Sequence, residues 1–262
     1  CCVLMLPAMF PYEAVATEAA AGNLTYYVSD TEGDDNNDGL SAETPWKTLE
    51  KVSELELAAG THIYLRSGDI WYGTWEINAN GGSRENPIVI TSYGDGAAPS
   101  LRYYTGSVQE GAAENVMVVN DANGLEIRNL DIGYANAGIR FQYTNSYDNE
   151  YIVVENCHFH DIYGVTQADN ISQLPFSASI YLSAQLDDPF DKQTGPYCVT
   201  DVTIRGCTTY DAASLTGYFG YAKDLNIIEC IAENNGYYGA VITSAGGVME
   251  RCVFRNNGTR PM

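Results

Sequence analysis

Five segments in the second half of the chain repeat one another, and this repeat constrains the fold more than any other feature. They begin near Asn123 and read LEIRNLDI, IVVENCHF, VTIRGCTT, LNIIECIA and VMERCVF. One position of the repeat is occupied in turn by Leu130, Cys157, Cys207, Cys230 and Cys252, at separations of 27, 50, 23 and 22 residues. An earlier apolar position is occupied by Ile127, Val154, Ile204, Ile227 and Met249.

Each repeat contains two short strands joined by a polar turn. The second strand reads GIRFQY, SIYLSA, GYFGYA and GAVITS in successive repeats. Alternating apolar residues with Asn and Gly turns, at a period near 23 residues, predict a coiled β solenoid. The 3.6-residue periodicity of helical repeats is absent, and so is the LxxLxL pattern of leucine-rich repeats. The gap of 50 residues holds either two full rungs or one rung with long loops on both sides of Ser179–Ala184.

The cysteines fit this repeat better than they fit a set of disulfide bonds. Cys1 and Cys2 stand at the start of the chain, which leaves five others, and four of those occupy one repeat position. A cysteine at a repeating apolar position acts as a small hydrophobic core residue. The chain contains no CxxC pair, which excludes a zinc ribbon.

These features together resemble the right-handed parallel β-helix of the pectate lyase superfamily. The segment YYVSDTEGDDNNDGLSAETPWKTLEKVSELELAAGTHIYLRSGDIWYG is similar to the opening of many secreted β-helix polysaccharide lyases and hydrolases. In those proteins a strand leads through a DG loop to a short helix that covers the end of the solenoid. Here Thr44 and Pro45 would begin that helix and Gly60 would end it. Its apolar stripe would comprise Leu49, Val52, Leu55 and Leu57. We therefore expect an all-β, right-handed parallel β-helix solenoid with a short N-terminal capping helix.

The charge balance bears on the partners of the protein. Asp and Glu number 34 against 13 Lys and Arg, a formal net charge of −21 over 262 residues. Nucleic acids and anionic membranes are held mainly by Lys and Arg, so both are disfavoured as partners. We expect a monomer that acts on a polysaccharide.

The two ends of the sequence suggest an exported fragment. The apolar run Val3–Phe10 is followed by small residues, which fits the tail of a secretory signal peptide over residues 1–21. Residues 22–262 would then form the β-helix domain, truncated at its C-terminal end because RNNGTRPM stops within a repeat. The expected location is secreted or at the cell surface.

Asp161 and Asp211 are the candidate catalytic residues. They belong to a column in the turn after the first strand, which reads Tyr134, Asp161, Asp211, Asn234 and Asn256. Adjacent rungs would place the two carboxylates about 5 Å apart, which is the spacing in a retaining glycosidase. Two close carboxylates would also raise one pKa and so supply both an acid and a base. If the gap of 50 residues hides two rungs, the pair is lost, and a plain ladder of turn residues is the competing interpretation.

His158 and His160 flank Phe159 in the segment ENCHFHDIYG. Cys157 and Phe159 point inward, so both histidines should point outward on one face. A metal site would need a third ligand, and none is obvious. A solvated face is the favoured interpretation, with both histidines as candidate substrate contacts.

A groove floor is predicted on the second strand, where Arg140, Tyr181, Phe219 and Val241 form one outward column. Aromatic faces beside an arginine suit a sugar chain. Ordinary surface is an equally good interpretation of this column. Lys192, in the second long loop, is a further candidate substrate contact.

Lyase chemistry and calcium remain alternatives. The resemblance implies a Lys or Arg base, for which Lys192, Lys223 and Arg140 are available, and calcium near Asp187 and Asp188. The NTD, DD and GHG elements of polygalacturonases are not matched. The segment DDNNDG offers Asp34, Asn36 and Asp38 as metal ligands, but the twelfth position of an EF-hand loop would be Pro45, so a tight turn competes with this site.

Three functions are therefore open. A glycoside hydrolase that needs no cofactor is slightly favoured, because the acidic balance and scarce lysine suit a neutral or weakly charged glycan. A calcium-dependent polysaccharide lyase and a glycan-binding solenoid without catalytic activity are the alternatives.

Overall fold

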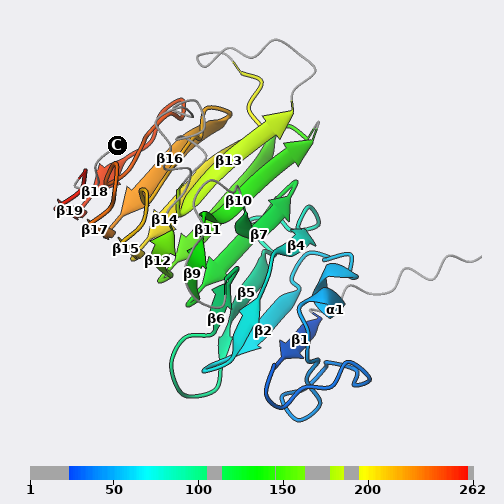
Figure 1. The fold of residues 1–262 in the computed structure, drawn as a ribbon. Helices are drawn as coiled ribbons and strands as arrows, with labels where there is room; N and C mark the ends of the chain where they lie inside the picture. The colour runs from blue at the N-terminus through cyan, green and yellow to red at the C-terminus, as the bar shows by residue number, and fades with distance from the viewer. Residues whose placement is uncertain (1–23, 105–113, 145, 163–177, 186–194, 259–262) are drawn as a thin grey trace, which may run out of the picture.

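The computed structural model describes residues 24–104, 114–144, 146–162, 178–185 and 195–258. In these residues three parallel sheets run along one axis, and Figure 1 shows their strands stacked side by side from the blue N-terminal end to the red C-terminal end. Each turn of the chain adds one strand to a sheet, so the molecule is a parallel β-helix, as the repeat predicted. None of the helices in the described ranges is long and apolar enough to cross a membrane.

The first sheet has eight strands in the order β1-β2-β5-β8-β11-β14-β16-β18. Their bounds are β1 Thr25–Val28, β2 His62–Arg66, β5 Ile88–Tyr93, β8 Leu125–Arg128, β11 Asn149–Glu155, β14 Val199–Arg205, β16 Ala222–Ile228 and β18 Met249–Glu250.

The second sheet has seven strands in the order β19-β17-β15-β12-β9-β6-β3. Their bounds are β3 Ile70–Tyr72, β6 Ser100–Arg102, β9 Asp131–Ala135, β12 His158–Ile162, β15 Thr208–Tyr210, β17 Ile231–Glu233 and β19 Val253–Arg255.

The third sheet has four strands in the order β13-β10-β7-β4. Their bounds are β4 Trp75–Asn78, β7 Asn115–Asn120, β10 Ala137–Thr144 and β13 Ile180–Gln185.

The strand register confirms the repeat alignment. Ile127, Val154, Ile204, Ile227 and Met249 are successive partners across β8, β11, β14, β16 and β18. Strand β11 pairs directly with β14, and β12 pairs directly with β15. The gap of 50 residues therefore contains a single rung, which contributes β13 to the four-stranded sheet.

Residues at the turns repeat as faithfully as residues in the strands. The predicted turn column has a left-handed backbone throughout, with φ between 50° and 55° at Tyr134, Asp161, Asp211, Asn234 and Asn256. Asn and Asp tolerate this conformation better than other residues with a β-carbon, because their short polar side chains bond to nearby backbone groups. The left-handed turn geometry thus accounts for the prevalence of Asn and Asp in this column.

The cysteine column lies in the core, as predicted. Cys157, Cys207 and Cys230 are fully buried, and all five cysteines of the described residues are free thiols. The Cys207 thiol donates to the carbonyl oxygen of Val154 on the preceding rung at 3.5 Å. Burial raises the pKa of Cys207 well above its ordinary value, which keeps this thiol protonated.

The expected capping helix is not supported. Among the described residues the one helix is α1, Glu50–Ser53, a single turn. Before it, Trp46 bridges to Val28, and the Asp35 carboxylate accepts hydrogen bonds from the amides of Lys47 and Thr48. These contacts hold the segment outside a helix. The apolar stripe still covers the core, because its residues Leu49, Val52 and Leu57 are buried.

The predicted register of the second strand was wrong after β13. Thr216 bridges to Ile180, and the Leu182 amide donates to the carbonyl of Tyr218, which puts Phe219 in line with Leu182. This register differs by one residue from the aligned pattern, and such a slip moves a side chain to the opposite face. Phe219 is consequently fully buried in the core and does not belong to an outward groove.

Candidate functional site

His160 is the centre of a polar cluster on the outer face of the seven-stranded sheet. Its Nδ1 lies 2.8 Å from Oδ2 of Asp161, and its Nε2 lies 3.2 Å from Oδ2 of Asp131 on the preceding rung. His160 is only 6% exposed, so the prediction of a solvated side chain was wrong for this residue. His158 is exposed, as predicted, and its Nδ1 lies 3.2 Å from the Thr208 hydroxyl.

Gly133 explains how the ring reaches the preceding rung. His160 pairs with Gly133, while Asp131 is the partner of His158, so the ring must lean diagonally over position 133. A β-carbon on Gly133 would lie 2.7 Å from Cε1 of His160 and 2.7 Å from its carbonyl oxygen. The absence of a side chain at this position therefore makes the contact with Asp131 possible.

Gly133→Ala should consequently displace His160 and lower the free energy of unfolding by about 1 to 2 kcal/mol, as expected for overpacking. Urea denaturation of the two proteins would measure the loss. In a His160→Ala background the same substitution should cost less, because the clash with the ring is gone. An equal cost in both backgrounds would contradict this role of Gly133.

Two tyrosine rings enclose the imidazole. Tyr134 contacts it edge-on at 5.2 Å between ring centroids, and Tyr210 stacks on it at 5.5 Å with an interplanar angle of 11°. Tyr210 comes from the next rung, where it is the register partner of His160, and it is 42% exposed. We call Asp131, Tyr134, His160, Asp161 and Tyr210 the His160 cluster.

The two carboxylates control the protonation of His160. Burial lowers the pKa of this group, but hydrogen bonds and charge attraction from Asp131 and Asp161 outweigh burial and raise it above the ordinary 6.5. For Asp131, burial raises the pKa, but hydrogen bonds from His160 and Ser100 outweigh burial. The net pKa of Asp131 is therefore lowered from its ordinary value of 3.8. An imidazolium that donates to both carboxylates is thus favoured.

A hollow adjoins the cluster on its Asp131 side. Its lining includes Asp69, Ile70, Ser100, Arg102, Asp131 and His158. The Ser100 hydroxyl donates to Oδ2 of Asp131 at 2.7 Å and accepts from Nε of Arg102 at 2.9 Å. The Arg102 guanidinium also lies 4.9 Å from the centre of the Tyr134 ring. The hollow therefore combines two carboxylates, an arginine, a histidine and one hydroxyl group beside the Tyr134 ring.

Asp161 and Asp211 occupy adjacent rungs, which satisfies the condition placed on the predicted pair. His160 pairs with Tyr210, and the Ala213 amide donates to the carbonyl of Ile162, so Asp161 and Asp211 stand opposite each other. Strands in a sheet are about 4.8 Å apart. Asp161 is partly buried against His160, whereas Asp211 is exposed.

Arg140 and Tyr181 of the predicted groove floor are register partners, but Tyr181 is buried and does not line an open groove. Arg140 pairs with Tyr181 on the outer face of the four-stranded sheet, and its Nε donates to Ser183 at 2.8 Å. The Tyr181 hydroxyl donates to Oδ1 of Asn115 at 2.6 Å, so this ring is buried against the sheet. Lys223, on β16 of the eight-stranded sheet, lies on another face of the coil from Arg140. The loop candidates Lys192, Asp187 and Asp188 lie outside the described residues.

A second polar network lies next to Tyr134 of the His160 cluster. Glu114 accepts hydrogen bonds from the Tyr104 hydroxyl at 3.1 Å and from Nδ2 of Asn136 at 2.9 Å. Burial and Glu114 together raise the pKa of Tyr104 to about 12. The Tyr104 amide donates to the carbonyl of Tyr134, which ties this network to the His160 cluster.

The proposed metal ligands of the DDNNDG segment bond to their own turn. Asp34 accepts from the amide and side chain of Asn36, and Asp38 accepts from the Leu40 amide and the Thr44 hydroxyl. In the part of the chain that the structure describes, no three His, Cys, Asp or Glu residues are grouped to hold a metal ion. Calcium binding here remains a prediction.

Sequence reasoning missed Asp131, Ser100 and Arg102 as site residues. Alignment of the repeat segments LEIRNLDI and IVVENCHF puts Asp131 opposite His158, and the structure pairs these two residues across β9 and β12. The diagonal lean of His160 depends on the single glycine at 133, which an average repeat pattern does not reveal.

Comparison with known proteins agrees with this architecture. No protein-family model matches the chain. A lacto-N-biosidase of Bifidobacterium longum subsp. longum is 39% identical over 83 residues, which are 30% of this chain and 5% of that protein. A GH136 lacto-N-biosidase structure from Eubacterium ramulus superposes with a TM-score of 0.65 at 20% identity, over 82% of this chain and 42% of that one. A rhamnogalacturonan lyase structure gives 0.53 at 17% identity, over 88% and 62%. The chain thus spans less than half of the lacto-N-biosidases it matches, and it shares the parallel β-helix fold of glycan-active proteins.

Proposed function

We propose that this chain carries the catalytic site of a glycoside hydrolase. The observation that carries the proposal is the placement of Asp161 and Asp211 at equivalent turn positions of adjacent rungs, beside the buried His160. A strand spacing of about 4.8 Å is close to the roughly 5 to 5.5 Å between the carboxyl groups of retaining glycosidases. The sequence likeness to a lacto-N-biosidase supports the same reaction class.

In this mechanism Asp161 is the nucleophile and Asp211 the acid and base. The Asp161 carboxylate bonds to the anomeric carbon as the glycosidic C–O bond breaks, and the Asp211 carboxyl group gives its proton to the departing oxygen. Asp211 then takes a proton from a water molecule, whose oxygen displaces Asp161 from the sugar. His160 holds Asp161 by its Nδ1–H and is itself held by Asp131.

The surrounding side chains provide the sugar contacts. Tyr210 offers an exposed ring face next to the acid pair, and His158 and Arg102 border the adjoining hollow. Arg140 extends the surface around the turn, and Lys192 is retained as a further contact. Tyr181 is buried, so it supports this surface from below and does not contact the sugar. Phe219 is excluded by its burial.

The substrate is a neutral or weakly charged glycan. A net charge of −21 repels polyanionic chains unless a cation intervenes. The named activity of the relatives makes glycans with a lacto-N-biose unit the first substrates to test. We further propose that the protein is exported, since polymeric glycans are met outside the cell, and that calcium is dispensable.

The test uses the intact gene product on neutral and uronic-acid glycans, with and without a chelator. We expect new reducing ends without the ultraviolet absorbance of unsaturated uronides, at a rate that the chelator leaves unchanged. Chelator-sensitive absorbance would replace the hydrolase with a lyase. Binding without any product would leave a glycan-binding solenoid.

A further inference from the structure

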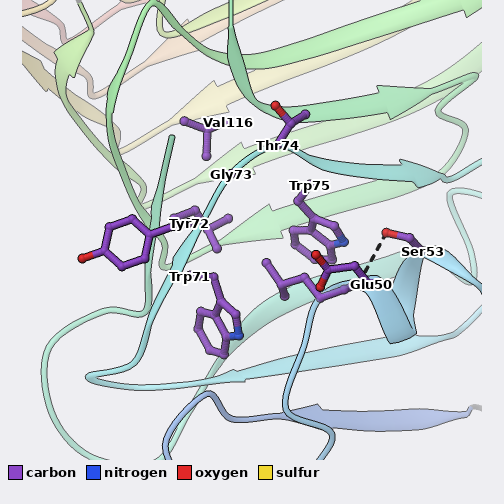
Figure 2. A pocket seen from close by; sticks show the side chains of 10 residues that line it. Glu50, Ser53, Trp71, Tyr72, Gly73, Thr74, Trp75 and Val116 are labelled. Carbon is purple, nitrogen blue, oxygen red and sulfur yellow. Dashed lines mark hydrogen bonds between the residues drawn. The ribbon is translucent and has the colours of Figure 1, made fainter. Parts of the chain in front are cut away.

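A pocket at the N-terminal end of the coil has the properties of a sugar-binding site. It lies between α1 and the connection from β3 to β4, and its lining includes Glu50, Ser53, Trp71, Tyr72 and Trp75 (Figure 2). Tyr72 is 52% exposed, and a β-carbon added to Gly73 would meet no atom within 4 Å. The pocket is therefore open to solvent beside Tyr72.

Trp75 supplies a polar group without a partner. The residue is 3% exposed, and its indole Nε1 has no hydrogen-bond acceptor within the described part of the chain. A buried tryptophan N–H usually finds an acceptor, and each exception calls for an explanation. The other two indoles follow the rule, because Trp46 donates to the carbonyl of Asn37 and Trp71 to that of Lys47. Figure 2 shows the Trp75 ring on the side of the pocket formed by Glu50 and Ser53.

The chemistry of the lining selects a hydroxyl-rich neutral ligand. A sugar hydroxyl can accept from the Trp75 N–H and donate to the Glu50 carboxylate, and a sugar ring face can pack on Tyr72. An anionic ligand would be repelled by Glu50 and by the net charge of the protein.

Tyr72, which borders the pocket, lies on the same face as the His160 cluster. Tyr72, Arg102, Gly133 and His160 are successive partners across β3, β6, β9 and β12. Three strand spacings correspond to about 14 Å along the axis of the coil. One extended glycan can therefore reach both places.

We propose that this pocket is a second sugar-binding site, which holds a neutral glycan about three rungs away from the acid pair. The proposal rests on the proposed function only for the identity of the glycan, because binding at the pocket does not require cleavage.

The three tryptophans make the test direct, since their indole N–H signals are resolved by ¹H–¹⁵N spectroscopy. In an Asp161→Asn protein titrated with the neutral lacto-N-tetraose, the Trp75 signal should move saturably while that of Trp46 stays fixed. Tyr72→Ala should weaken this binding about tenfold. Tyr238→Ala, which removes another exposed tyrosine from the far end of the coil, should leave it unchanged.

A Trp75 signal that stays fixed at saturating glycan overturns the second site, even where the wild-type protein cleaves that glycan. Equal weakening by Tyr72→Ala and Tyr238→Ala overturns it as well. Saturable movement of the Trp75 signal, together with a wild-type protein that cleaves no glycan, supports the pocket and contradicts the hydrolase, so the two proposals fail separately.

Discussion

Asp211→Asn should lower kcat on the cleaved glycan by about 10²- to 10⁴-fold, which is the usual contribution of a positioned general acid and base. Asp161→Asn should lower it at least as much, because the amide cannot form the covalent bond to the anomeric carbon. Both substitutions should leave the fold intact. Asp161 and Asp211 have φ near 50°, and Asn adopts this left-handed backbone as readily as Asp.

The matched control is Asp224→Asn. Asp224 also has a left-handed backbone, with φ of 57°, but it belongs to β16 of the eight-stranded sheet, on another face of the coil. Its substitution should leave kcat unchanged. Full activity in both the Asp161 and Asp211 variants would reduce the pair to a ladder of turn residues. A loss that affects only one of them would point to a different partner carboxylate, with Asp131 as the nearest neighbour across His160.

Much of this architecture is predictable from the sequence because a solenoid repeats its local environment. Leu130, Cys157, Cys207 and Cys230 of the repeat column are buried and Cys252 is partly buried, so one apolar pattern identifies them all. The turn column is similarly regular, because the left-handed backbone favours Asn and Asp, which occupy every position of the column except Tyr134.

The errors arose where one rung departs from the average. An additional residue between Thr216 and Phe219 turned Phe219 into the core, and only the observed backbone register reveals it. His160 points outward as the alternation predicts, yet the rings of Tyr134 and Tyr210 cover it. Its ring lies over Gly133, where no side chain occupies the space. Alternation gives the side of the sheet on which a residue lies, whereas its exposure depends on the neighbouring rungs.

The capping helix was predicted wrongly because a contact between residues distant in the sequence decides the local structure. Helix signals at Thr44 and Pro45 are local, and they were overridden by the Asp35 carboxylate, which lies 12 residues before Lys47. The acid pair of the candidate site could therefore be predicted from the repeat. The hydrogen-bond partners of His160 could not, because they depend on contacts between rungs.

Asp131→Asn should make the stability of the protein less dependent on pH. His160 has a raised pKa in the folded state, so its ion pair stabilises fully below the unfolded value of 6.5 and is lost as pH rises through the folded pKa. Asp131 has a lowered pKa, so its contribution is present above 3.8 and is lost as pH falls through the folded value. The two together contribute most between pH 3.8 and 6.5.

In that window the wild-type protein should exceed Asp131→Asn by about 1.5 to 3 kcal/mol, the usual contribution of a hydrogen bond to a charged group. The difference should shrink as His160 loses its proton at higher pH, which urea denaturation between pH 4.5 and 9 would follow. Asp201→Asn is the control, because Asp201 pairs with Arg84 at an exposed position at 2.6 Å. It should cost only about 0.2 to 1 kcal/mol, without a step above pH 6.5. A difference for Asp131→Asn that stays constant to pH 9 would show that this contribution to stability does not depend on the titration of His160.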